Sequence, residues 1–261
     1  MTERSYQRLV VTQEGARATI ALSNPARKNA IGPVMVNELL WALEDAVHDE
    51  TVRLVVITGV GDAFCAGGDF AQMTGGADGP ALPPKGDYAD LLLALVRCPK
   101  PLVARVNGAA MGGGLGIVAA CHFAVAVDTA KLGTPEVNVG LFPMMIMAVL
   151  ARLVPRRRLL EMMLFGEKLS ASEAKEANVV GRVVPAEELD AAIAELEAKV
   201  VSKSPITLKL GLEAFAAQAD LALEDALPLL REKLGACLAT EDAREGLMAF
   251  LEKRKPAWKG R

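Results

Sequence analysis

Residues 108–126, GAAMGGGLGIVAACHFAVA, carry the clearest structural signal in the sequence. Three consecutive glycines in it, residues 112–114, come just before an apolar run that is typical of a buried helix. Each glycine lowers helix stability by roughly 1 kcal/mol relative to alanine, so three together need a structural or functional reason. The run FAVAVD, residues 123–128, follows and is typical of a buried strand. A glycine-rich helix start between strands predicts an α/β core.

Strands and helices alternate along the first half of the chain, and helices dominate the second half. Residues 74–87, TGGADGPALPPKGD, interrupt this order with a Gly- and Pro-rich loop, which we expect to act as a lid over a site. Strands are predicted at 17–24, 52–61 and 101–108, and helices at 33–49 and 88–98. From about residue 143 onward the chain is predicted to be helical, interrupted only by VVGRVV at 179–184. The late helices carry more apolar surface than one peripheral layer needs, which predicts self-association.

Composition narrows the possible classes of protein. The chain has 261 residues and a net charge of -3, without the basic excess that nucleic-acid binding requires. The charged N-terminus has no secretory h-region, and no apolar run reaches the ~18 residues of a membrane helix. The four cysteines have no C-x-x-C spacing, as expected for reduced thiols. We therefore expect a cytoplasmic enzyme or binding protein without membrane or nucleic-acid partners.

Several familiar uses of glycine or histidine fit the sequence poorly. Gly114, Gly116 and Ala119 match the dinucleotide pattern G-x-G-x-x-A, but they come after residue 100 rather than in the first βα unit. No G-K-[ST] follows the glycines, which excludes a P-loop. The only histidines are His48, expected to be solvated near a helix end, and His122, expected to be structural. They form a poor metal-ligand set, and no G-x-S-x-G elbow is present, so we predict no metal site and no serine hydrolase.

Binding of an oxyanion by backbone N–H groups fits the glycine-rich sequence better. Glycines at a helix start expose N–H groups that have no partner within the helix, and together with the helix dipole these can hold an oxyanion. A second Gly-rich turn, DAFCAGGDF at residues 62–70, also follows a predicted strand. Each turn alone is more simply explained as a tight turn. Two such turns after successive strands favour one N–H from each, aimed at a single carbonyl oxygen.

These motifs together resemble the enoyl-CoA hydratase/isomerase (crotonase) superfamily. AFCAGGDF, VNGAAMGGGLG and LGTPEVNVGLFP occur in the order and spacing of that family, between NPARKNAI near the start and AFLEKRKPAWKGR at the end. The resemblance implies a crotonase-like spiral of ββα units in residues 1–200, which holds the acyl-CoA site. It also implies a helical trimerisation region in residues 201–261, and hence a homotrimer or a dimer of trimers.

The resemblance also implies the site residues. The thioester oxygen is expected between the N–H groups of Gly68 and Gly113, where a side chain at Gly113 would crowd it. No separate cofactor is implied, because coenzyme A is part of the substrate. The other residues expected to bind substrate are Arg27, Lys28, Ala30, Ala66, Asp69, Phe70, Met111, Gly116 and Pro135, joined by Phe250 and Lys253 of a neighbouring subunit. Charged side chains such as Lys28 and Lys253 are otherwise explained as solvated, and Phe250 as a core residue.

The sequence departs from typical hydratases of the family at the catalytic carboxylates. Those hydratases use two glutamates, and here one of the two positions is Gly116 while the other is Glu136. One base suffices to move a proton from C2 to C4, whereas hydration must also activate a water. The methionine-rich segment 142–148 after Glu136 is predicted either to pack in the core or to form a dry acyl pocket that raises the Glu136 pKa. We therefore predict a Δ3 to Δ2 enoyl-CoA isomerase, with an enoyl-CoA hydratase or a weakly catalytic acyl-CoA-binding protein as alternatives.

Overall fold

The computed structural model describes residues 4–69, 72 and 82–261. Its larger sheet has the strand order β1-β2-β3-β5-β7-β10, in which only the first pair is antiparallel. The smaller sheet has the order β4-β6-β8-β9, with β9 antiparallel to β8. The strands are β1 (Leu9–Glu14), β2 (Arg17–Leu22), β3 (Leu54–Gly59), β4 (Ala63–Cys65), β5 (Leu102–Val106), β6 (Ala109–Met111), β7 (Phe123–Val127), β8 (Lys131–Gly133), β9 (Lys168–Ser170) and β10 (Arg182–Val184).

Helices fill the connections between these strands. Those of the first 201 residues are α1 (Pro33–His48), α3 (Tyr88–Val96), α4 (Gly113–Ala120), α5 (Met144–Leu150), α6 (Arg156–Phe165), α7 (Ala171–Glu176) and α8 (Leu189–Val201), with 3-10 turns η1 (Pro25–Arg27), η2 (Pro135–Val139) and η3 (Ala186–Glu188). The remaining helices are α9 (Pro205–Gln218), α10 (Leu223–Leu238) and α11 (Glu241–Leu251). Among the described residues, no helix is long and apolar enough to span a membrane.

The chain winds as a spiral because successive strands alternate between the two sheets. β3, β5 and β7 belong to the larger sheet, and each is followed within a few residues by β4, β6 or β8 of the smaller one. α4 then follows β6, and η2 and α5 follow β8. This repetition is the ββα spiral that the sequence motifs imply, and it brings the segments after β4, β6 and β8 to one edge of the smaller sheet.

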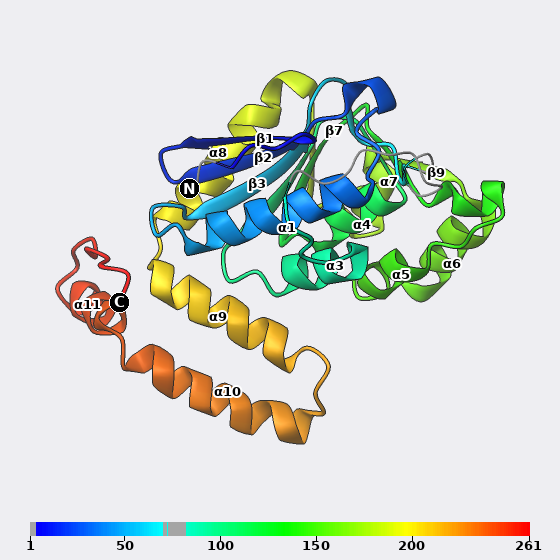
Figure 1. Ribbon diagram of the computed structural model, residues 1–261. Helices are drawn as coiled ribbons and strands as arrows, with labels where there is room; N and C mark the ends of the chain where they lie inside the picture. The colour runs from blue at the N-terminus through cyan, green and yellow to red at the C-terminus, as the bar shows by residue number, and fades with distance from the viewer. Residues whose placement is uncertain (1–3, 70–71, 73–81) are drawn as a thin grey trace.

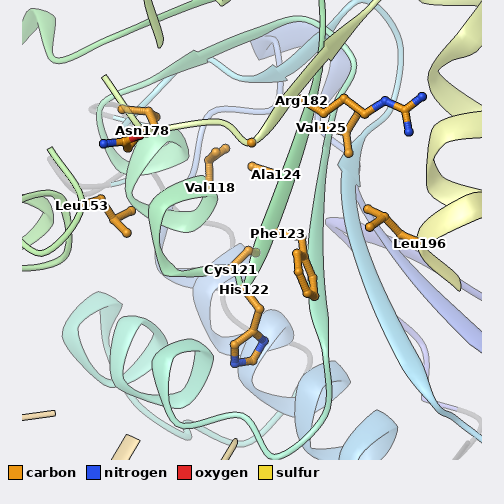
Figure 2. Close-up of a pocket in the computed structure, with 12 residues that line it drawn as sticks. Val118, Cys121, His122, Phe123, Ala124, Val125, Leu153, Asn178, Arg182 and Leu196 are labelled. Atoms are coloured by element: carbon orange, nitrogen blue, oxygen red, sulfur yellow. The ribbon is translucent and has the colours of Figure 1, made fainter. Parts of the chain in front are cut away.

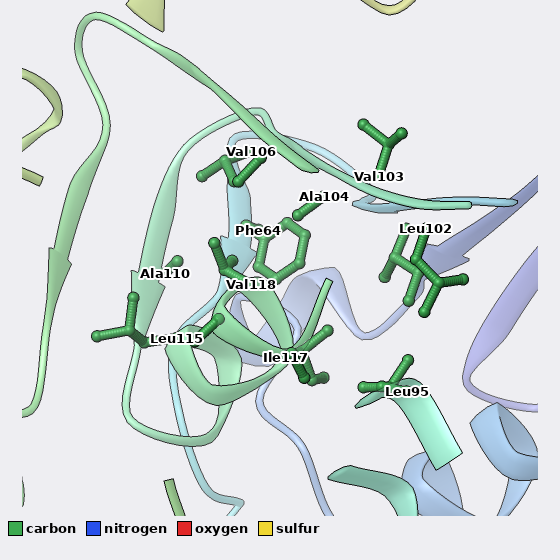
Figure 3. Close-up of a cluster of buried hydrophobic side chains, with 14 of the residues drawn as sticks. Phe64, Leu95, Leu102, Val103, Ala104, Val106, Ala110, Leu115, Ile117 and Val118 are labelled. Atoms are coloured by element: carbon green, nitrogen blue, oxygen red, sulfur yellow. The ribbon is translucent and has the colours of Figure 1, made fainter. Parts of the chain in front are cut away.

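The core lies between the sheets and the helices that cover them. β3 is buried along its whole length, since α1 and α8 lie on opposite faces of the larger sheet (Figure 1). Figure 3 shows Leu115 and Ile117 of α4 gathered with Phe64 of β4, all of them fully buried. α4 is thus apolar on all sides because it is surrounded by protein.

The last three helices lie apart from this core. α9 and α10 form an antiparallel pair beneath it, and α11 packs beside them at the end of the chain (Figure 1). Their exposed apolar side chains include Phe215, Leu227, Leu234 and Phe250, each more than half exposed. Such a surface is far more apolar than a single solvated layer of helices needs.

Candidate active site

The two glycine-rich turns lie side by side. Asn107, at the end of β5, accepts a hydrogen bond from the Gly59 N–H at 3.1 Å and donates one to the carbonyl of Gly61 at 2.9 Å, which ties the β5–β6 connection to the β3–β4 connection. β4 and β6 then run parallel, so the turns that follow them meet. A Cβ on Gly112 would lie 3.6 Å from the Cα of Gly67, which shows how closely the turns approach.

Two backbone N–H groups remain available where the turns meet. The backbone around Gly68 pairs with Ile31, because Ile31 donates to the Gly67 carbonyl at 2.8 Å and Asp69 donates to the Ile31 carbonyl at 2.8 Å. This pairing leaves the Gly68 N–H without a partner among the described residues. The Gly113 N–H is likewise unpaired there, because it lies in the first turn of α4.

Glu136 lies against the same glycines. It is the second residue of η2, which ends at Gly140 in the left-handed conformation, and the preceding Thr134 is fully buried and donates to the Met162 carbonyl at 2.9 Å. A Cβ on Gly112 would come within 2.8 Å of Glu136 Oε1. Glu136 Oε2 is buried and has no hydrogen-bond partner among the described residues. Burial raises the pKa of this carboxyl group above its usual value, against a smaller lowering by its own backbone N–H.

The residues predicted to surround coenzyme A cluster beside the first glycine turn. Ala66 donates its N–H to the Lys28 carbonyl at 2.9 Å, and Lys28 and Ala66 are exposed while Ala30 is half-buried. Arg27 pairs with the buried carboxylate of Asp69 at 3.0 Å and leaves about half of its own side chain exposed. Asp69 thus holds Arg27 in place, a simpler role than direct substrate contact.

The other predicted residues have different locations. Met111 is buried at the end of β6, and Pro135 is half-buried beside Glu136. Phe250 and Lys253 are exposed on or just after α11, which lies at the far end of the chain from α4 (Figure 1). Phe70 and most of the predicted lid loop lie outside the described residues.

The structure defines what surrounds Gly113 and the methionine-rich segment. A Cβ on Gly113 would face Ile31 Cγ2 at 3.1 Å and the Tyr88 ring at 3.5 Å, so its immediate crowding comes from these side chains. The glycine whose side chain would crowd the catalytic groups is Gly112, which also has a φ of +49°. Met144 and Met145 are more than half exposed, so they do not pack in the core, and an acyl pocket formed by them stays a prediction.

Ile146 of the same segment is buried, and its side chain fills part of the space beside Gly116. A Cβ on Gly116 would lie 2.4 Å from Ile146 Cγ2 and 2.4 Å from the Tyr88 hydroxyl oxygen. Contacts this short do not occur between real atoms, so a side chain at this position would displace one of the two neighbours. The place where a second carboxylate would begin is therefore already occupied.

The two histidines are located as predicted, away from these groups. His48 is exposed at the end of α1. His122 Nδ1 accepts the Leu102 N–H at 2.9 Å, and burial lowers the pKa of its imidazole. Figure 2 shows His122 at a surface pocket of about 320 Å³ that Cys121, Phe123 and Arg182 also line. None of the predicted site residues lines this pocket, so His122 is a structural hydrogen-bond acceptor.

Sequence reasoning missed three residues that build the site. Asn29 is fully buried and donates to the carbonyls of Val60 and Ala63 at 2.9 and 2.8 Å, which fixes the turn before Ala30. Gly112 and Tyr88 were also missed. The asparagine between Lys28 and Ala30 could have been recognised in the sequence as a residue that fixes a turn. In contrast, no residue near Tyr88 in the sequence indicates that its hydroxyl reaches Gly113.

Two N–H groups that are unpaired among the described residues, beside a half-buried carboxylate, are the kind of arrangement that can stabilise an enolate oxygen while a base moves a proton. Comparison with known proteins agrees with this class. The family model described as "Enoyl-CoA hydratase/isomerase" matches residues 12–261, and the chain belongs to that family. It is therefore an enzyme of the enoyl-CoA hydratase/isomerase family with the crotonase fold.

Individual relatives match over nearly their whole length. A probable enoyl-CoA hydratase of Bacillus subtilis is 37% identical over 93% of this chain and 95% of its own. The mitochondrial enoyl-CoA hydratase domain-containing protein 3 of Rattus norvegicus is 35% identical over 94% of this chain and 82% of its own. The crystal structure of an enoyl-CoA hydratase from Bacillus anthracis superposes with a TM-score of 0.88, at 29% identity, and covers 98% of this chain and 100% of that one.

Proposed function

We propose that the protein is an enoyl-CoA isomerase that moves a double bond from Δ3 to Δ2. The observation that carries the proposal is that one half-buried carboxylate, Glu136, lies beside two amides that are unpaired among the described residues, while the space at Gly116 is filled by Tyr88 and Ile146. In this reaction the Glu136 carboxylate takes the proton from C2. The electrons of the C2–H bond form a dienolate, whose oxygen accepts hydrogen bonds from Gly68 and Gly113.

Glu136 then returns its proton to C4, and the new double bond lies between C2 and C3. No oxidant, water or second acid is consumed, so one carboxylate completes the cycle. Burial supports this use, because a carboxylate with a raised pKa is a stronger base when ionised and a usable acid when protonated. Coenzyme A would extend past Lys28, Ala30 and Ala66, with Arg27 held beside it by Asp69.

Hydration of a 2-enoyl-CoA is the second candidate, favoured by the names of the relatives, which are called enoyl-CoA hydratases. It requires a water that is held and activated at C3, together with proton delivery to C2. Glu136 would have to do both, because the space at Gly116 leaves no room for a partner carboxylate. We therefore rank hydration below isomerisation.

We also propose that residues 201–261 form a trimerisation region. The exposed apolar side chains of α9 to α11 support this proposal, as does the distance of Phe250 and Lys253 from the site of their own chain. In a trimer these two residues would approach coenzyme A bound to a neighbouring subunit. A cytoplasmic location stays a prediction.

A product assay separates the candidates. Purified protein is incubated with trans-3-hexenoyl-CoA and, separately, with crotonyl-CoA, and the products are resolved by chromatography. Isomerisation predicts rapid formation of trans-2-hexenoyl-CoA and little 3-hydroxybutyryl-CoA. Faster hydration of crotonyl-CoA would contradict the proposal and would favour the hydratase.

A further inference from the structure

Gly116 faces a crowded space beside Tyr88 and Ile146. It lies one turn after Gly113 on α4, and a Cβ added to it would point at the Tyr88 hydroxyl and at Ile146, with an atom of each only 2.4 Å away. Gly211 and Gly235, which also lie inside helices, have nothing within 4 Å of the corresponding position. The glycine at 116 is therefore required by two particular side chains and not by the helix itself.

The Tyr88 side chain is placed accurately by the start of α3. Asp87 caps this helix by accepting hydrogen bonds from the Ala89 and Asp90 N–H groups, and Asp90 accepts one in return from the Asp87 N–H at 2.9 Å. Tyr88 is the first helical residue, and its hydroxyl donates to the Gly113 carbonyl at 2.5 Å. This bond links α3 directly to the first turn of α4.

The surroundings keep the Tyr88 phenol protonated. Burial raises its pKa strongly, and the nearby Cys65 thiol and Glu136 carboxyl groups raise it further. A protonated phenol is a hydrogen-bond donor, so the contact to the Gly113 carbonyl persists through the whole pH range in which Glu136 changes its charge. Tyr88 therefore acts on the helix start and not as a second base.

We propose that Tyr88 is a positioning and specificity-determining residue, whose hydroxyl holds the Gly113 backbone for oxyanion binding and, with Ile146, keeps a second water-activating group out of the site. The specificity half of this inference rests on the proposed isomerase function, whereas the positioning half does not. Fixing the Gly113 carbonyl fixes the orientation of the residue whose N–H faces the thioester oxygen. Filling the space at Gly116 leaves Glu136 as the single proton carrier.

Tyr88→Phe tests the role of the hydroxyl while it keeps the ring. We expect kcat for isomerisation to fall about tenfold, the scale of one lost hydrogen bond that orients a catalytic group, with KM changed less than about twofold. The matched control is Tyr6→Phe, which removes the only other tyrosine hydroxyl of the chain, 3.4 Å from Asp45 and remote from the glycine turns. An unchanged kcat in Tyr88→Phe would overturn the inference.

Gly116→Ala tests the same contact from the other side. Its methyl group should push the Tyr88 hydroxyl from the Gly113 carbonyl, so we expect a fall in kcat similar to that of Tyr88→Phe and no further fall in the double variant. Gly235→Ala, at an open helical position, is the control and should retain full kcat. Additive losses in the double variant would contradict a shared mechanism.

Infrared spectroscopy of a bound acyl-CoA distinguishes failure of this inference from failure of the proposed function. Hydrogen bonds in the oxyanion site polarise the thioester carbonyl and lower its stretching frequency, whatever reaction follows. We expect a smaller shift in Tyr88→Phe than in the wild type and in Tyr6→Phe. Equal shifts would overturn the positioning role, even if the wild type proves to be a hydratase.

Replacing Ile146 with alanine tests the specificity half. The smaller side chain opens space beside Gly116 for a water molecule, so hydration of crotonyl-CoA should rise relative to isomerisation of trans-3-hexenoyl-CoA. Leu150→Ala, a buried truncation one turn later in α5, is the control for general loss of packing. An equal product ratio in both variants would contradict the exclusion role.

Discussion

Glu136 and Gly112 are in such close contact that a single methyl group does not fit between them. A Cβ on Gly112 would lie 2.8 Å from Glu136 Oε1, and the Gly112 backbone has a φ of +49°. The N–H of this glycine is also taken, since it donates to the Gly133 carbonyl at 2.9 Å. The middle of the site therefore depends on Gly112 having no side chain, while the next residue, Gly113, supplies the free N–H.

The first prediction follows from this contact. Gly112→Ala should lower kcat about 10²-fold, because the methyl group displaces the Glu136 carboxylate from its position beside the substrate. Gly15→Ala is the matched control, since Gly15 also has a positive φ, +58°, but nothing lies within 4 Å of its Cβ position. Both variants should lose stability, whereas only Gly112→Ala should lose activity. Full activity in Gly112→Ala would contradict the placement of Glu136.

The second prediction concerns pH. Burial raises the Glu136 pKa above 4.5, so the base ionises only above that value and isomerisation should increase as the pH rises through the folded pKa. In the window between 4.5 and the folded pKa, the unfolded chain has lost this proton while the folded chain keeps it. Folding stability should therefore fall as the pH rises through the window.

Glu136→Gln removes this loss, so its melting temperature should exceed that of the wild type at neutral pH and match it below pH 4.5. Glu50→Gln, at an exposed glutamate after α1, is the control for loss of a carboxylate elsewhere in the chain. If Glu136→Gln melted below the wild type at neutral pH, the burial argument would be wrong.

The third prediction concerns His122, whose Nδ1 accepts the Leu102 N–H. Burial lowers its pKa below 6.5, so the unfolded chain binds this proton first as the pH falls, and stability should decrease as the pH drops below 6.5. His122→Asn keeps an acceptor and should flatten this dependence in denaturant titrations, with the exposed His48→Asn as control. If the stability of His122→Asn depended on acidic pH as strongly as that of the wild type, protonation of His122 would not be the cause.

The fourth prediction concerns assembly. Light scattering should find a trimer or hexamer, and Leu227→Asp should dissociate it, because this side chain is 57% exposed on α10 of the single chain. Val10→Asp, also exposed but on β1, should leave the assembly intact. Deletion of the residues after 200 should expose apolar surface and cause aggregation. A stable wild-type monomer at micromolar concentrations would refute the proposed trimer.

The longer elements could be predicted from sequence because they carry enough repeats of their own pattern. Six of these elements lie within or close to the predicted ranges: α1, α3, β2, β3, β5 and β7. The strands of the smaller sheet, such as β4 and β6, have three residues each, too few for an alternating pattern, and were missed as strands. β1 was missed as well, because its outer half is exposed and polar.

The site residues also fall into two groups, those that local sequence motifs predict and those that depend on contacts across the fold. The motifs around Gly68, Gly113 and Glu136 are local, and the structure places Glu136 and the Gly67 turn against the neighbouring Gly112. The catalytic roles of Gly68, Gly113 and Glu136 stay predictions. Tyr88 and Ile146 act through contacts with Gly116 across the fold, and no local pattern encodes such contacts. The space at Gly116, which ranks isomerisation above hydration, could therefore be understood only once the side chains were placed.

The central claim is that Glu136 alone carries the proton from C2 to C4. The most direct measurement is a single-turnover reaction of trans-3-hexenoyl-CoA labelled with deuterium at C2, with mass spectrometry of the product from the wild type and from Glu136→Gln. We expect deuterium at C4 of the wild-type product, and a rate at least ~10²-fold lower in the variant, the scale typical of a lost general base. Wild-type turnover in Glu136→Gln would contradict the claim.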